Sequence, residues 1–221
     1  VSGSVSGNWF DNNPNGVDYV VTGNIGIALG NSLSIAANTT IQFAGNYKLV
    51  VNGVLTVNGI IGSEVTFTPR SPGNWNGIEI QNNTNNISFT GCIIEKVSKN
   101  PGTCTSATGS GAVYIYNSDN VTFSDCTFQE NDVCHSGGAI AFYSSDVEID
   151  GCMFNNNDAD EKGGAIYLEN SDGDILESDF SSNNAEYGGA IYDGTGASVT
   201  IQGNDIADED YPNTAYYGAG I

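Results

Sequence analysis

The sequence predicts an all-β fold, a single-domain right-handed parallel β-helix (a solenoid) of about eight coils, from three observations. Gly-Ala pairs that begin at residues 111, 138, 164, 189 and 218 recur at steps of 27, 26, 25 and 29. A second marker, Phe-x-x-Asn, keeps a step of 26 through Phe128, Phe154 and Phe180. Between the markers, apolar residues alternate in short runs with no helical period. Such short strands can bury an apolar face only by stacking on the next repeat.

The N-terminal half follows the same plan less regularly. Residues 1–16 are expected to cap the first coil, because an uncovered solenoid end presents unpaired strand edges. Residues 17–110 are expected to form irregular coils with a long insertion at 98–110, and residues 111–221 to hold the regular repeats. Since a fresh Gly-Ala marker stands just before Ile221, we expect the chain to be part of a longer one, with end-to-end stacking on other copies as a further expectation.

Stacked coils place residues one repeat apart in vertical columns, about 4.8 Å from one another. The phenylalanines of the second marker predict an apolar column and its asparagines an amide ladder. Three cysteines that share one repeat position predict a column of small buried side chains, and a disulfide within this column is an open alternative. The predicted columns are Phe128, Phe154 and Phe180, then Asn131, Asn157 and Asn183, then Cys92, Cys126 and Cys152.

The other two cysteines, Cys104 and Cys134, fall in loops of successive coils. We predict a disulfide between them, which would pin the insertion at 98–110 and would fit an oxidising compartment. Zinc binding is the competing use of these residues, but the sequence contains no Cys-x-x-Cys pair and no close Cys/His array.

The repeats carry a family resemblance. Gly-Gly-Ala-Ile at 137–140, 163–166 and 188–191, combined with Phe-x-x-Asn, resembles the repeats of chlamydial-type polymorphic outer-membrane proteins. The resemblance covers roughly residues 111–206. It implies a right-handed β-helix on a secreted or surface-anchored protein, often an adhesin, and it implies no catalytic residues. The opening coils, over 41–53 and 72–78, look like those of secreted bacterial and archaeal β-helix proteins.

The charge balance excludes several partners. The chain has 26 acidic residues against 5 basic ones, for a formal net charge of −21. Nucleic acid is excluded because its binding rests on Lys and Arg that neutralise phosphates, and anionic membranes are disfavoured by the same repulsion. No run of about 18 apolar residues is present, so no transmembrane segment is predicted. The start of the chain resembles a mature N-terminus, so a secreted or cell-surface location is expected.

Two groups of residues are candidate binding sites. An alternating strand pattern sends tyrosines outward on one face, where they could stack on sugar rings or pack on a protein partner. The alternative is that they are ordinary strand residues on a solvated sheet. An acidic turn, Asp158, Asp160 and Glu161, has the oxygen ligands that calcium prefers, with a solvated turn as the alternative. The tyrosines are Tyr114, Tyr116, Tyr143, Tyr167 and Tyr192.

No catalytic residue is predicted. Calcium-dependent lyases need a basic residue beside a carboxylate cluster, and of the basic residues only Lys162 sits beside a clear acidic cluster, in a turn. His135, the single histidine, lies in a cysteine-containing loop and is expected to be inert. A pair of carboxylates suited to glycoside hydrolysis has no specificity in so acidic a chain.

The leading hypothesis is therefore a non-enzymatic structural or adhesive module of an adhesin, filament or matrix. It would contact an extracellular glycan or surface protein over many coils. The alternatives are a polysaccharide-binding module that uses the tyrosines, with or without calcium, and a polysaccharide lyase or hydrolase. Ice binding ranks last, because the outward rows lack regular threonine ladders.

Overall fold

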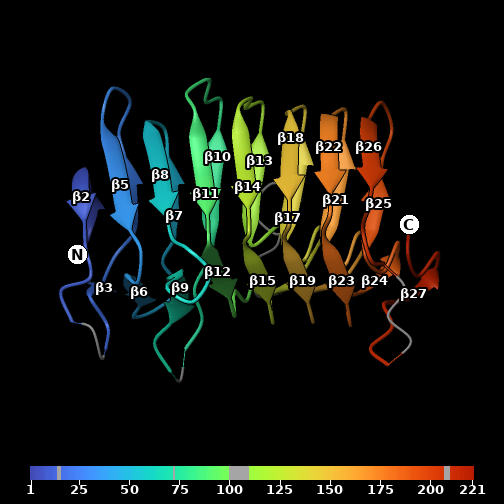
Figure 1. Ribbon diagram of the computed structural model, residues 1–221, viewed down its shortest axis with the longest axis horizontal. Helices are drawn as coiled ribbons and strands as arrows, with labels where there is room; N and C mark the ends of the chain where they lie inside the picture. Colours follow the sequence, from blue (N-terminus) through green and yellow to red (C-terminus); the bar gives the residue numbers. More distant parts are fainter. Residues whose placement is uncertain (14–15, 72, 100–109, 207–209) are drawn as a thin grey trace.

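The computed structural model describes residues 1–13, 16–71, 73–99, 110–206 and 210–221 (Figure 1). The elements of this described part are all strands, which leaves it without a helix that could cross a membrane. The strands wind around one axis, and the coils stack in sequence order from the N-terminal to the C-terminal end of an elongated molecule (Figure 1). The prediction of an all-β parallel solenoid of about eight coils is confirmed.

Four parallel sheets, here named A to D, run along the stack. Sheet A contains β1 (Gly3–Ser4), β4 (Ile25–Ile27), β7 (Leu49–Val51), β10 (Ile78–Gln81), β13 (Val113–Tyr116), β17 (Ile140–Tyr143), β21 (Ile166–Glu169) and β25 (Ile191–Asp193). Sheet B contains β2 (Gly7–Trp9), β5 (Ser32–Ala36), β8 (Val54–Asn58), β11 (Ile87–Thr90), β14 (Val121–Ser124), β18 (Val147–Asp150), β22 (Asp172–Leu176) and β26 (Ser198–Gln202).

The other two sheets are shorter. Sheet C contains β3 (Tyr19–Val21), β6 (Thr40–Phe43), β9 (Val65–Pro69), β12 (Cys92–Glu95), β15 (Thr127–Gln129), β19 (Met153–Asn155) and β23 (Asp179–Ser181). Sheet D contains β16 (Asp132–Val133), β20 (Asp158–Ala159), β24 (Asn184–Tyr187) and β27 (Thr214–Tyr217). Because sheet D starts at β16, the described coils gain a fourth side only in the C-terminal half.

Residues 1–16, the expected cap, contribute the end strands of two sheets. β1 pairs in parallel with β4, and β2 pairs in parallel with β5. Trp9 is buried, and its ring stacks on that of Tyr19 with 4.3 Å between the ring centroids. The described part of this segment is therefore a first rung of the solenoid, and its role as a cap stays a prediction.

The core lies inside the coils and is built by strand alternation. In β9, Val65 and Phe67 point inward and are buried, whereas the threonines between and after them are half-buried on the outside. The predicted phenylalanine column is confirmed: Phe128, Phe154 and Phe180 are in register, with ring centroids 5.0 and 4.7 Å apart and nearly parallel planes. Full burial of each such side chain stabilises the fold by about 1.5–3 kcal/mol.

The corner that leads into sheet A explains the paired glycines of the repeat. Gly163, the first of its pair, has a φ of 64°, a left-handed conformation that residues with a Cβ rarely adopt. The second, Gly164, lies so close to the next coil that an added Cβ would be 2.1 Å from the carbonyl oxygen of Gly189. Gly137 and Gly138 show the same two constraints one coil earlier. The paired glycines are thus required by the backbone conformation of the corner and by the close stacking of the coils.

The predicted amide ladder, Asn131, Asn157 and Asn183, is confirmed and buried at the corner after sheet C. Each Nδ2 donates to the Oδ1 of the next asparagine at 2.9 Å, and the ladder continues to Asn213. Each Nδ2 also donates to a main-chain carbonyl of the preceding coil, as from Asn157 to Phe128 at 3.0 Å. The ladder therefore satisfies polar corner groups that the strands leave unpaired.

Candidate functional site

The tyrosines of the predicted stripe lie on the outer face of sheet A, but most of their surface is covered. Tyr114 and Tyr167 are only 5% and 7% exposed, and Tyr143 and Tyr192 are half-buried. Tyr116, at 44%, is the only one of the five that counts as exposed. The stripe is thus a small hydrophobic cluster on the outside of the solenoid wall, and its rings do not form the open row that sugar stacking requires.

The tyrosine rings pack on one another. The centroid distances are 5.5 Å from Tyr114 to Tyr143, 5.2 Å from Tyr143 to Tyr167 and 5.8 Å from Tyr167 to Tyr192. The Tyr167 hydroxyl donates to Glu169 Oε2 at 2.8 Å. The ring faces and the Tyr167 hydroxyl are occupied by contacts within the protein. The stripe therefore stabilises sheet A and leaves little ring surface for a ligand.

The buried groups near this cluster predict an alkaline stability maximum. Burial lowers the pKa of Lys99 to about 8, and burial raises that of Tyr114 to about 12. Between pH 8 and 10.5 the unfolded chain binds the extra lysine proton, so Lys99 by itself should raise stability by up to about 3 kcal/mol. The buried thiols of Cys126 and Cys152 keep their protons in the folded chain, so they oppose this rise above about pH 9. Between pH 10 and 12 the folded chain holds the tyrosine proton, so stability should fall. Urea unfolding from pH 7 to 12 measures this profile, and Lys99→Met should remove its rising limb while leaving its falling limb.

The side chains of the acidic turn do not converge on one centre in the described part of the chain. Asp158, Asp160 and Glu161 are all exposed, and within the described ranges no three His, Cys, Asp or Glu side chains converge to hold a metal ion. Asn184 Nδ2 donates to both carboxylate oxygens of Asp158, at 3.3 and 3.2 Å. His135 Nδ1 lies 2.9 Å from Glu161 Oε1, so the histidine is in a surface pair. The predicted calcium ligands are therefore not brought together.

The predicted cysteine column is confirmed. Cys92, Cys126 and Cys152 are buried free thiols, and the sulfur atoms of Cys92 and Cys126 are 3.2 Å apart. The hydrogen bond with Cys126, together with burial, raises the pKa of Cys152, so its thiol stays protonated. Cys134 is 7% exposed, but Cys104 lies outside the described residues, so the Cys104–Cys134 disulfide stays a prediction.

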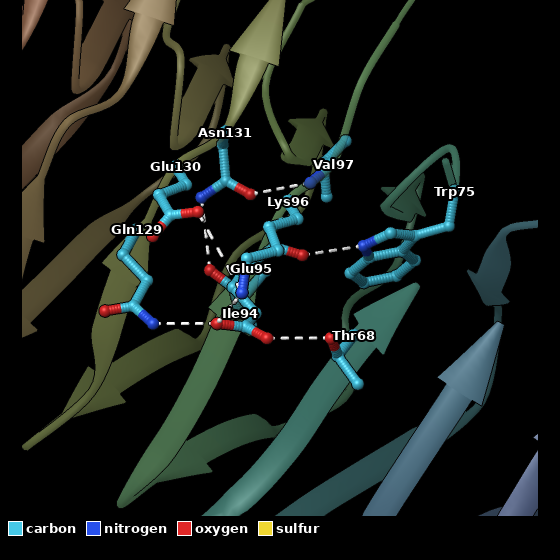
Figure 2. Close-up of polar contacts among 9 residues, drawn as sticks. All are labelled: Thr68, Trp75, Ile94, Glu95, Lys96, Val97, Gln129, Glu130 and Asn131. Atoms are coloured by element: carbon cyan, nitrogen blue, oxygen red, sulfur yellow. Dashed lines mark hydrogen bonds and ion pairs between the residues drawn. The ribbon is translucent and has the colours of Figure 1, made fainter. Parts of the chain in front are cut away.

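A polar row that the sequence patterns did not reveal lies on the outer face of sheet C (Figure 2). Glu95 accepts a hydrogen bond from Thr68 Oγ1 at 2.7 Å and another from Gln129 Nε2 at 2.7 Å. Lys96 Nζ lies 3.1 Å from Glu95 Oε2. Burial alone would raise the pKa of Glu95, but these three partners together hold it below its ordinary value. The Glu95 carboxylate is therefore held in place, and its oxygen atoms are engaged by neighbours in the row.

This row could not be recognised in the sequence because its residues are not evenly spaced. Thr68 and Glu95 are 95 − 68 = 27 residues apart, but Glu95 and Gln129 are 129 − 95 = 34 apart. The insertion at 98–110 lengthens one coil, so no constant period marks the row. The alternation of β12 and β15 was the available signal, since it places Glu95 and Gln129 on the outside beside buried Ile94 and Phe128.

Two buried side chains fix the main chain behind the row (Figure 2). Trp75 is fully buried, and its Nε1 donates to the carbonyl oxygen of Glu95 at 2.8 Å. Asn131 donates to the carbonyl oxygen of Ile94 at 3.1 Å and accepts from the amide of Val97 at 3.0 Å. The segment that carries Glu95 is therefore held at both ends.

An open cleft of about 470 Å³ lies beside this row, where the first strand of sheet D begins. Its volume falls within the range of about 300–1,000 Å³ that is typical of small-molecule sites. It spans three coils, and Pro69, Ser71 and Gly73 form part of its wall. Its polar walls are Thr68, Asn74, Lys96, Ser98, Glu130 and Asp132. This cleft is the candidate functional site.

The comparisons with known proteins agree with the architecture. Residues 55–221, most of the chain, match the family model described as a right handed beta helix region. No curated protein matches the chain significantly, and no solved structure does.

Proposed function

Since the chain belongs to the right-handed β-helix family, we propose that it is a non-enzymatic, secreted or cell-surface module that holds a partner by repeated contacts along one face. The partner is an extracellular glycan or a surface protein, as in an adhesin, a filament or a matrix component. The resemblance of the Gly-Gly-Ala-Ile and Phe-x-x-Asn repeats to polymorphic outer-membrane proteins supports a surface role.

The observation that carries this proposal is the outer face of sheet B. Ser34, Thr56, Ser88 and Thr122 stand in register on four successive strands, all half-buried. The second outward row of β5, β8, β11 and β14 consists of small or polar residues, and neither row on these strands contains a charge. A face without charges over four successive strands is unusual in a chain of net charge −21.

Such a face suits multivalent contact. Neighbouring coils are about 4.8 Å apart, so equivalent hydroxyl groups repeat at that distance along the axis. Each hydrogen bond gives only about 0.5–1.5 kcal/mol, but a rigid face makes many of them for one loss of translational freedom. Strong attachment therefore depends on the whole row.

A matched pair of variants tests the proposal. Thr56→Glu/Thr122→Glu places two carboxylates on the neutral face, and Thr66→Glu/Thr127→Glu places two at half-buried outward positions of sheet C. Beads that carry each protein are tested under flow on surfaces coated with dextran, mannan, cellulose or collagen. We expect the native chain to be retained on at least one surface, with at least about tenfold weaker retention of the sheet B variant, about 1.4 kcal/mol.

Three results would contradict the proposal. The first is no retention of the native chain on any surface. The second is an equal loss in both variants, which would show a general charge effect. The third is release of new reducing ends or unsaturated products from polygalacturonate or the neutral polysaccharides, which would identify an enzyme instead.

A further inference from the structure

The edge of the cleft that Lys96 forms is held by hydrogen bonds to the main chain. Lys96 has a φ of 55°, and the residues on either side of it are held by Trp75 and Asn131. Glu95, beside the cleft, binds the Lys96 ammonium group and two neutral donors, so the polar groups along this edge are already internally paired. A ligand would find this surface preorganised, which lowers the ordering cost of binding.

Two carboxylates of the cleft face solvent. The carboxylate-bearing side chains Glu130 and Asp132 are exposed within it, 51% of the Glu130 side chain being accessible. The Lys96 ammonium lies 3.9 Å from Glu130 and 3.1 Å from Glu95, so two carboxylates share one ammonium group, and Asp132 adds a further carboxylate to the cleft. The cleft therefore has a local net negative charge.

The neighbouring sheet D strengthens this field. Asp132 is in register with Asp158 of the next coil. Burial, and then the charges of Asp158 and Asp160, raise the pKa of Asp132. A cationic group bound beside Asp132 would relieve this repulsion, whereas a carboxylate or phosphate would add to it.

The remaining cleft walls suit a polyhydroxylated ligand. Thr68, Asn74 and Ser98 supply hydroxyl and amide groups, and the cleft has no exposed aromatic ring among its described lining residues. Sugar hydroxyl groups bind through such mixed donors and acceptors, and an open cleft admits the end of a chain while the rest stays in solvent.

We propose that this cleft binds an amino-sugar unit, a hexosamine with an unacetylated amine, at the end of a glycan. The amine lies between Glu130 and Asp132, and the hydroxyl groups contact the polar wall. The site is on a different sheet from the neutral face of sheet B, so this inference goes beyond the proposed function and does not depend on it.

Calorimetric titration with short glucosamine oligomers tests the site, at one fixed ionic strength. N-acetylglucosamine oligomers and galacturonate oligomers of the same length serve as comparison ligands. We expect saturable binding of the glucosamine oligomer, markedly weaker binding of its acetylated form and none of the galacturonate. Glu130→Gln/Asp132→Asn should weaken binding at least about tenfold.

A charge-matched variant controls for attraction to the acidic chain as a whole. Glu148→Gln/Asp174→Asn removes two carboxylates from sheet B, where the two residues are in register, and should leave the affinity unchanged within about twofold. All four side chains are exposed, so both variants should fold, which circular dichroism verifies. Equal losses in the two variants, equal binding of the acetylated oligomer, or no saturable binding would overturn the proposal. The bead assay on sheet B is unaffected by any of these results.

Discussion

Replacing Gly164 with alanine should destabilise the protein by at least about 4 kcal/mol or prevent its folding. The added Cβ would lie 2.1 Å from the carbonyl oxygen of Gly189, and 2.5 and 2.6 Å from the amide nitrogen and carbonyl oxygen of Asn184. All three atoms belong to the main chain of the next coil, so relief of the clash requires the coils to separate. Urea unfolding followed by circular dichroism measures the loss.

Gly26→Ala is the matched control for this prediction. Gly26 lies in strand β4 of sheet A, and its added Cβ would meet only the carbonyl oxygen of Val50, at an ordinary contact distance of 3.6 Å. Because glycine within a strand is entropically costly, this change should be neutral or slightly stabilising. If Gly164→Ala were as stable as Gly26→Ala, the coils would not be stacked as closely as the structure requires.

Asn157→Leu should destabilise the protein by about 3 kcal/mol or more. The change removes a fully buried amide that donates to Phe128 and Asn183 and accepts from Asn131. The Phe128 carbonyl oxygen would lose its side-chain partner, and the ladder would be cut in the middle. The midpoint of urea unfolding should fall without a change in the slope, because the unfolded surface is the same.

Asn155→Leu provides the comparison two residues earlier, at the end of strand β19. Asn155 is exposed, and its Nδ2 makes one hydrogen bond, to Ser181 Oγ at 3.1 Å. We expect this change to cost no more than about 0.5 kcal/mol, as for most surface substitutions. Similar losses at the two positions would show that the buried ladder contributes no more than a surface amide.

The candidate site was much less predictable than the fold. The outward tyrosines were placed on the correct face, because strand alternation fixes which side a residue faces. Their burial was not predictable, since it depends on ring contacts such as that between Tyr143 and Tyr167. Likewise, adjacency in the turn suggested that Asp158 and Asp160 share a ligand, but neighbours along a chain need not point to one centre.

The sequence by itself determined the solenoid, its period and its columns of phenylalanine, asparagine and cysteine. It could do so because a stack of coils turns a repeat along the chain into a contact in space. Only the tertiary structure brought Thr68, Glu95 and Gln129 together beside the cleft, since the insertion at 98–110 breaks the period there. Contacts between residues one repeat apart can be predicted from the spacing of the repeat. Contacts beside an insertion cannot, because they depend on the path that the chain takes there.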